Sequence, residues 1–191
     1  MSTHLDTATS RPSGRDQVTA ALLSATERLC VASQPSTFTV ADIAREANTT
    51  TSLLYFYFES KDDIVIATLR WIASDLDAMA AGATPSEMAT VVSRLLSARP
   101  AFVRIISWLI LEGRSVTEEM GDHPFLRRLL VSLSADNSDD AHTQAGAVVA
   151  VLLSNALFSG DINAAIGRKG DDHQLSDALD GCIAALLNPQ L

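Results

Sequence analysis

The chain has 191 residues, of which 47% are hydrophobic and 5% aromatic, with nine glycines and six prolines. Few turn-forming residues and abundant alanine and leucine exclude a turn-dense all-β fold and favour a helical one. The formal net charge is −9, and residues 1–65 hold five Arg and Lys against eight Asp and Glu. This acidic balance excludes a protein that binds nucleic acid through a broad positive surface.

The first residues are polar and small and show no periodicity, so we expect a flexible arm over residues 1–14. A helix is predicted over residues 15–32. Its buried stripe has helical spacing and consists of Val18, Leu22, Ala25 and Leu29. The run Ser-Gln-Pro-Ser at residues 33–36 ends this helix.

Two short helices are predicted next, in quick succession. Thr39 and Asp42 have the spacing of a capping box at the start of the first. Asn48 ends it in a left-handed conformation, which Asn tolerates better than most residues. Thr50 or Thr51 caps the second short helix.

Ser60 and Asp63 have the spacing of a second capping box, which begins a long helix that runs to about Met79. A linker follows at residues 80–84, and Pro85 is placed at the first position of another helix. Further helices are predicted over residues 100–112, 124–135, 140–159 and 172–187. No alternating pattern indicates a strand, so the sequence predicts an all-α chain of about nine helices.

Two short helices that are joined by a tight turn and braced by a preceding helix form a helix-turn-helix, whose second helix fits the major groove of DNA. Residues 43–47 read Ile-Ala-Arg-Glu-Ala, and residues 54–61 read Leu-Tyr-Phe-Tyr-Phe-Glu-Ser-Lys. At this spacing the two runs resemble the signature of the TetR family of bacterial transcriptional regulators. The resemblance implies a helix-turn-helix DNA-binding domain over residues 15–65 and a larger helical domain for effector binding and dimerisation over residues 66–191.

Three places depart from the common family pattern. Asn48 stands at the turn glycine, Thr49 at the following small apolar residue, and Ser52-Leu53 at a Gly-Thr pair. Asn48 fits the turn, and Thr49 is expected to pack with its methyl group inward. Leu53 is expected to be exposed, where it can meet a thymine methyl but cannot hydrogen-bond a base edge. The departures therefore affect which operator is read and leave the fold unchanged.

The resemblance and the side-chain chemistry together predict a set of DNA-contacting residues. Thr39 is expected to offer its hydroxyl and backbone N–H to a phosphate, and Lys61 to add a cation at the start of the next helix. The hydroxyls of Tyr55 and Tyr57 can reach phosphate, although either ring could instead form the edge of a helical core. Base edges or nearby phosphates are expected to meet Thr50, Thr51, Ser52 and Leu53.

Three further residues fit two interpretations each. Phe56 fits either the core or a contact with the DNA backbone. Arg11 and Arg15 fit either insertion of the N-terminal arm into the minor groove or a solvated arm.

For residues 66–191 the resemblance implies a homodimer that forms through the last two long helices. The helix over residues 140–159 is apolar nearly all round, and a dimer face would bury its second side. A small, mostly apolar effector is expected to bind among the helices of this domain. Its candidate contacts, which could equally be plain core residues, are Trp71, Phe102, Ile106, Trp108, Phe125, Asn155 and Phe158.

These features predict a sequence-specific DNA-binding transcriptional regulator, a repressor that leaves a palindromic double-stranded operator when its effector binds. The alternative is a helical lipophile-binding module or a bundle enzyme that does not bind DNA. The four histidines are isolated and the sequence has no HExxH, CxxC or Gly-rich phosphate loop, so we expect no catalytic residue, metal or cofactor. Without an apolar leader or a membrane-length segment, the chain is expected to be cytoplasmic with no membrane partner, and Cys30 and Cys182 to be free thiols.

Overall fold

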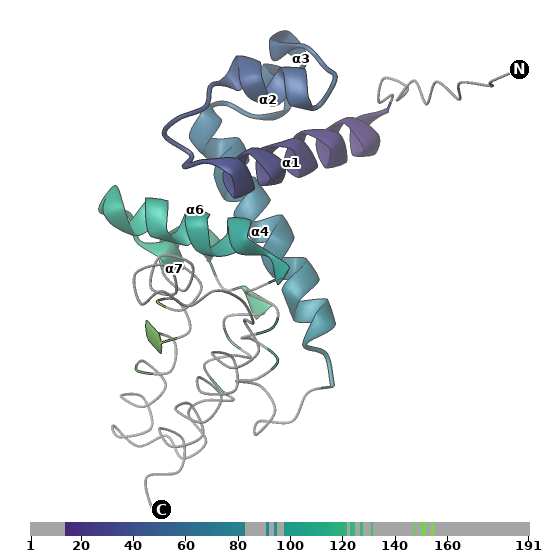
Figure 1. Ribbon diagram of the computed structural model, residues 1–191. Helices are drawn as coiled ribbons and strands as arrows, with labels where there is room; N and C mark the ends of the chain where they lie inside the picture. The colour runs from purple at the N-terminus through teal and green to yellow at the C-terminus, as the bar shows by residue number, and fades with distance from the viewer. Residues whose placement is uncertain are drawn as a thin grey trace, which may run out of the picture. The chain divides into compact units, whose positions relative to one another are not determined.

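The computed structural model describes residues 14–82 and 98–121 and the single positions 91, 94, 123, 124, 127, 131, 147, 150, 151 and 154. These residues contain helices and no strand, as the sequence predicts (Figure 1). The chain divides into two compact units, Met1–Thr68 and Leu69–Leu191. One helix, α4, contributes residues to both units, and the sequence-predicted boundary between residues 65 and 66 also falls within it.

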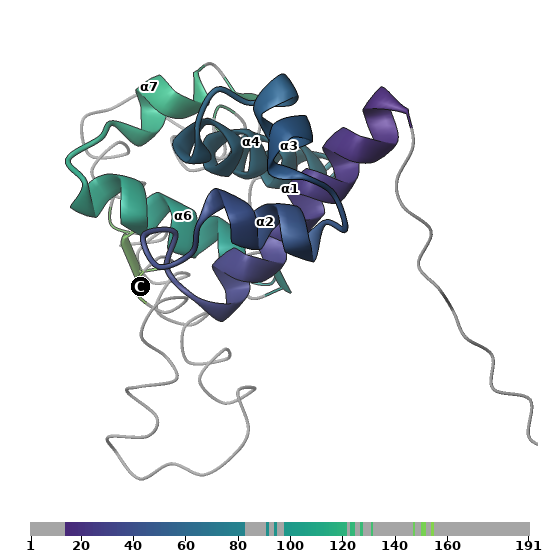
Figure 2. The ribbon, with the colours of Figure 1, turned by 90° about the horizontal axis from the view of Figure 1, so that it is seen from above.

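The described part of the first unit contains four helices. They are α1 (Arg15–Ala32), α2 (Val40–Glu46), α3 (Thr51–Tyr57) and the beginning of α4 (Lys61–Met79). α2 packs against α1, and α3 follows α2 after a tight turn (Figures 1 and 2). Each of the four helices contributes a large side chain that is fully buried, namely Leu22, Ile43, Leu54 and Ile64. The hydrophobic pattern of the sequence thus packs the two short helices α2 and α3 on a core that they share with α1 and α4.

The buried face of α1 differs slightly from the predicted stripe. Val18, Leu22 and Ala25 are buried as predicted, whereas Leu29 is only partly buried. Thr26 is fully buried instead, and its hydroxyl donates to the Leu22 carbonyl at 2.9 Å. Because that hydrogen bond satisfies the hydroxyl within the helix, a threonine is tolerated on the buried face.

The described part of the second unit contains the rest of α4, α6 (Pro100–Leu111) and α7 (Val116–Met120). α6 has proline in its first turn and ends before Gly113, which has a φ of 70°, as the sequence predicts. α7 was not predicted, because a single turn is too short to show a hydrophobic period. Its signal is the spacing of Ser115 and Glu118, whose backbone N–H donates to the Ser115 hydroxyl at 3.3 Å.

Several sequence predictions fall wholly or partly outside the described residues. The predicted helices from Pro85, over 124–135 and over 140–159 are described only at single positions, which are helical. Outside the described residues lie the helix over 172–187 and, among the residues singled out above, Arg11, Phe125, Asn155, Phe158 and Cys182. None of the helices among the described residues is long and apolar enough to cross a membrane.

Candidate nucleic-acid interface

The start of α2 is fixed by the predicted capping box between Thr39 and Asp42. The Thr39 hydroxyl accepts from the backbone N–H of Asp42 at 3.3 Å and donates to the Asp42 carboxylate at 2.7 Å. The backbone N–H of Thr39 donates to the same carboxylate at 2.8 Å. Both donors of Thr39 that the sequence assigns to a phosphate are therefore engaged with Asp42 in this structure.

These hydrogen bonds lower the pKa of the Asp42 carboxyl from 3.8 to about 2, and the Thr39 side chain is the largest cause. The backbone N–H of Thr39 and the guanidinium of Arg45 lower the pKa further, because each stabilises the carboxylate. The Arg45 side chain remains 75% exposed, so it is a solvent-facing cation on α2. Arg45 was not among the residues that the sequence predicts to contact DNA, although it occupies an outward position in the Ile-Ala-Arg-Glu-Ala run.

The turn between α2 and α3 contains the predicted left-handed residue. Asn48 has a φ of 52°, and the backbone N–H of Thr49 closes the turn by donating to the Ala44 carbonyl at 2.8 Å. Where the sequence predicts an inward methyl group on Thr49, the structure buries the hydroxyl oxygen, which has no hydrogen-bond partner among the described residues. Burial of this oxygen destabilises the folded state, because the oxygen loses its hydrogen bonds to water and gains no partner among the described residues.

The first half of α3 presents hydroxyl groups to solvent. Thr50 is its N-cap, and the Thr50 hydroxyl accepts from the backbone N–H of Leu53 at 3.2 Å. Thr51 and Ser52 are exposed, but Leu53 is only partly exposed. The expectation of a fully exposed Leu53 is therefore wrong, since the residue lies at the edge of the buried face marked by Leu54.

The second half of α3 carries three consecutive aromatic rings. Tyr55 is 56% exposed and Phe56 is 79% exposed, whereas Tyr57 is half-buried. Phe56 and Tyr57 meet edge to face with their centroids 5.2 Å apart. This exposure excludes a core role for Tyr55 and Phe56. α3 contains no charged residue, so its surface consists of hydroxyl and aromatic groups with the exposed part of Leu53.

The start of α4 is capped as the sequence predicts, with one difference. The Ser60 hydroxyl accepts from the backbone N–H of Asp63 at 3.0 Å. The Asp63 carboxylate accepts from the backbone N–H of Glu59 at 3.1 Å, one residue before the cap. The box is thus present, with its return hydrogen bond displaced by one position.

The Lys61 side chain turns to the connection between α1 and α2. Its ammonium group donates to the carbonyls of Pro35 at 2.9 Å and Phe38 at 3.3 Å, and lies 5.8 Å from the centroid of the Phe38 ring. The group that the sequence assigns to a phosphate is therefore bound to backbone carbonyls in this structure.

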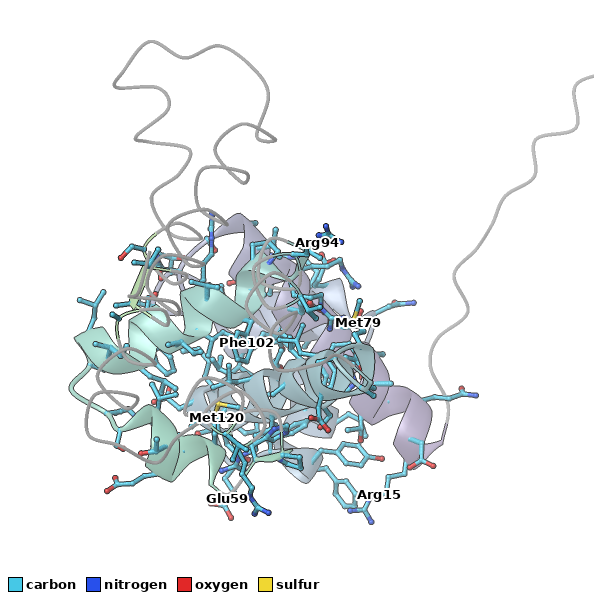
Figure 3. All side chains as sticks on the ribbon, turned by 90° about the horizontal axis from the view of Figure 1, so that it is seen from below. Arg15, Glu59, Met79, Arg94, Phe102 and Met120 are labelled. Atoms are coloured by element: carbon cyan, nitrogen blue, oxygen red, sulfur yellow. The ribbon has the colours of Figure 1, made fainter. Side chains whose placement is uncertain are left out.

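The described residues of the first unit include four basic side chains: Arg15, Arg28, Arg45 and Lys61. Arg28 pairs with Glu46 at 2.6 Å, whereas Arg15 is exposed at the first turn of α1 (Figure 3). Lys61 is bound to carbonyls, and Arg28 and Arg45 pair with carboxylates of the same unit while their side chains stay 54% and 75% exposed. The positive charge available to DNA is correspondingly small.

Four of the residues predicted to contact an effector are described: Trp71, Phe102, Ile106 and Trp108. Phe102 is enclosed by side chains and only 3% exposed (Figure 3), Ile106 and Trp108 are also buried, and Trp71 is half-buried. The guanidinium of Arg99 lies 5.4 Å from the centroid of Trp71, and that of Arg114 lies 5.6 Å from the centroid of Trp108. The described residues include no group of three or more His, Cys, Asp or Glu placed to hold a metal ion.

The helix-turn-helix coincides with a known family pattern. The family model for bacterial regulatory proteins of the tetR family matches residues 22–68. An HTH-type transcriptional repressor of Mycobacterium tuberculosis is 25% identical over 183 residues, which are 93% of each chain. Residues 22–68 thus match the DNA-binding domain of the TetR family, and the curated relative resembles the chain over nearly its whole length. The curated relatives are named as HTH-type transcriptional regulators, and the family model describes bacterial regulatory proteins, so the comparisons support a DNA-binding regulator.

Solved structures of regulators share the fold of this chain. A transcriptional regulator from a Rhodococcus species superposes with a TM-score of 0.69 at 19% identity, covering 90% of this chain and 96% of that one. The regulator FadR of Bacillus subtilis, solved with stearoyl-CoA, has a TM-score of 0.61 at 16% identity, with coverages of 88% and 97%. The similarity extends well beyond the helix-turn-helix into the second unit.

Proposed function

We propose that this chain is a TetR family repressor that binds a palindromic operator as a homodimer and leaves it when a small, largely apolar effector binds the second unit. The observation that carries the proposal is the outer face of α3, where exposed hydroxyls adjoin two exposed aromatic rings. Exposed rings cost free energy in water, so such a face suits a partner surface. The name of the Mycobacterium tuberculosis relative, a repressor, supports repression over activation.

The proposed division of labour follows the chemistry of each side chain. The hydroxyls of Thr51 and Ser52 face base edges, and the exposed part of Leu53 meets a thymine methyl. α3 has no Arg or Lys to read guanine and no Asn or Gln to read adenine, so we expect thymines at the contacted positions. Groups proposed to meet phosphates are Thr39, Thr50, Tyr55 and Tyr57, and Lys61 at the first turn of α4 is proposed to position these contacts.

The hydrogen-bond donors of Thr39 have a competing partner within the protein, which the sequence does not reveal. Both of its donors bind the Asp42 carboxylate, so contact with a phosphate exchanges one of these bonds for another of similar kind. The net gain from that contact is therefore small. We expect Thr39→Ser, which keeps the cap, to bind DNA as the wild type does.

The DNA-binding proposal is tested by selecting sites for the full-length protein from a random duplex library. The expected product is an inverted repeat with half-sites about one helical turn apart, bound by two chains. Light scattering of the free protein is expected to give twice the chain mass of 20.3 kDa. Failure to enrich any sequence, or a monomer that binds single half-sites, would contradict the proposal.

The effector proposal is tested through the two tryptophans of the chain, Trp71 and Trp108. Stearoyl-CoA, which the Bacillus subtilis regulator binds in its crystal, is a suitable first probe, with fatty acids and free coenzyme A as controls. A bound apolar ligand is expected to change the tryptophan fluorescence and to weaken operator binding. Because a ligand can shift only an equilibrium between states that it binds differently, equal operator affinity with and without a saturating ligand would exclude that ligand as the effector.

A further inference from the structure

We infer that the side chains of Lys61 and Arg28 are positioning groups, which hold the two ends of α2 in place for DNA binding and do not contact phosphate. This inference rests on the proposed function, because it concerns how the DNA-binding surface is held. Both are cations, and in a chain of net charge −9 each would otherwise be a natural candidate for a phosphate contact.

The first anchor joins α4 to the residues before α2. The Lys61 ammonium binds the Phe38 carbonyl, directly before the cap Thr39, and the carbonyl of Pro35. Pro35 and Phe38 are buried and both hydrogen bonds are partly buried, so the charged donor binds these carbonyls more strongly than it would in water. Two of the three ammonium N–H groups are used in this way.

The second anchor joins α1 to the last residue of α2, Glu46. The Arg28 Nε donates to the Glu46 carboxylate at 2.6 Å, and its Nη2 donates to the Glu46 backbone carbonyl at 3.3 Å. The remaining nitrogen, Nη1, donates to the hydroxyl of Ser24 at 2.9 Å, which fixes the guanidinium one turn back on α1. Arg28 therefore holds both the side chain and the main chain at the end of α2.

Anchors at both ends matter because α2 has only seven residues. A helix of this length is not stable by itself in water, so its position depends on what holds it. When an anchor is lost, α2 is in place in a smaller fraction of the molecules, and the apparent affinity for DNA falls by that fraction. The number of phosphates contacted in the complex does not change, so neither does the slope of log affinity against log salt.

The test compares Lys61→Met with wild-type full-length protein, since methionine keeps much of the aliphatic stem and removes the donors. Fluorescence anisotropy measures binding to the duplex selected by the wild type and to a scrambled duplex, each over a range of salt. We expect weaker binding to the selected duplex, by at most about tenfold for a lost charge-assisted hydrogen bond, with an unchanged slope. A slope that falls by about one unit would show a lost phosphate contact and overturn the inference for Lys61. Arg45→Gln removes one exposed cation of α2 and is the matched control for the loss of a single positive charge.

A second variant keeps the inference testable if Lys61→Met unfolds the first unit. Glu46→Ala removes the partner of Arg28 and makes the protein less negative. Simple electrostatics predicts that this variant binds DNA more tightly, whereas loss of the anchor predicts weaker binding to the selected duplex. Tighter binding would overturn the inference for Arg28. A wild-type protein that selects no duplex would instead refute the proposed function, so the two failures are distinguishable.

Discussion

Replacing Thr49 by valine is expected to stabilise the protein, which is unusual for a change in a tight turn. The Thr49 hydroxyl oxygen is buried without a hydrogen-bond partner among the described residues, and valine has nearly the same shape without the oxygen. An unsatisfied buried polar group costs about 1–3 kcal/mol. Because the residue as a whole is only half-buried, we expect the lower end, a gain of about 1 kcal/mol.

The assay is urea unfolding of the full-length protein, followed by far-UV ellipticity and by amide exchange in α2 and α3. Thr49→Val is expected to raise the midpoint without changing the slope, which marks a change in stability alone. The neighbouring Thr50 is the matched control: its hydroxyl caps α3, so Thr50→Val is expected to cost about 1 kcal/mol. Equal effects of the two substitutions, or destabilisation by Thr49→Val, would refute the reasoning.

Three further predictions concern the capping box, the turn and the second unit. The folded pKa of Asp42, about 2, lies below its ordinary value of 3.8, so its contribution to stability is present above about pH 4 and is lost as the pH falls to about 2. Acid titration of the unfolding free energy is expected to show a smaller decline in this window for Asp42→Asn. Asn48→Ala is expected to cost about 1 kcal/mol in urea unfolding because φ is 52°, whereas Asn48→Gly changes stability little; equal values would contradict the left-handed turn. Arg70→Met removes the two guanidinium donors to the Glu119 carbonyl and is expected to lower stability by about 1 kcal/mol, read by tryptophan fluorescence; no change would show that this contact is not formed in solution.

The helix-turn-helix was largely predictable because its signals are local. Thr39 and Asp42, Asn48 and Thr50 each act within a few residues along the chain, through capping and left-handed turn geometry. Such geometry depends on the backbone and the nearest side chains, so residue type and spacing determine it. The family resemblance added the role of the segment in DNA binding, which geometry alone does not reveal.

The partners of the charged groups could not be predicted, because they come from distant parts of the chain. Lys61 binds a carbonyl that lies 26 positions earlier, and Arg28 binds Glu46 at a separation of 18. The sequence assigned Lys61 to a phosphate because a cation beside the free backbone donors of a helix start suits one, as the family resemblance also implies. Only the packing of α4 beside the connection between α1 and α2 supplies the carbonyls.

The degree of exposure of residues at the edge of a helical face also could not be predicted from the sequence. The pattern identified Leu54 as inward, but it did not distinguish the half-buried Leu53 and Tyr57 from the exposed Phe56. These differences depend on how far neighbouring elements extend over α3. α7 was missed for a related reason, since a single turn has too few residues for a hydrophobic period.

The central claim is that the exposed face of α3 reads DNA sequence, and its most direct test is a ratio of two affinities. Full-length protein and the double variant Thr51→Ala, Ser52→Ala are titrated with the selected duplex and with a scrambled duplex of equal length at one fixed salt concentration. The wild type is expected to prefer the selected duplex by about 1,000-fold or more. The variant, whose changes lie on exposed helical positions, is expected to lose much of this preference while its affinity for the scrambled duplex stays the same. A wild type without preference, or a variant that keeps the full ratio, would contradict the claim.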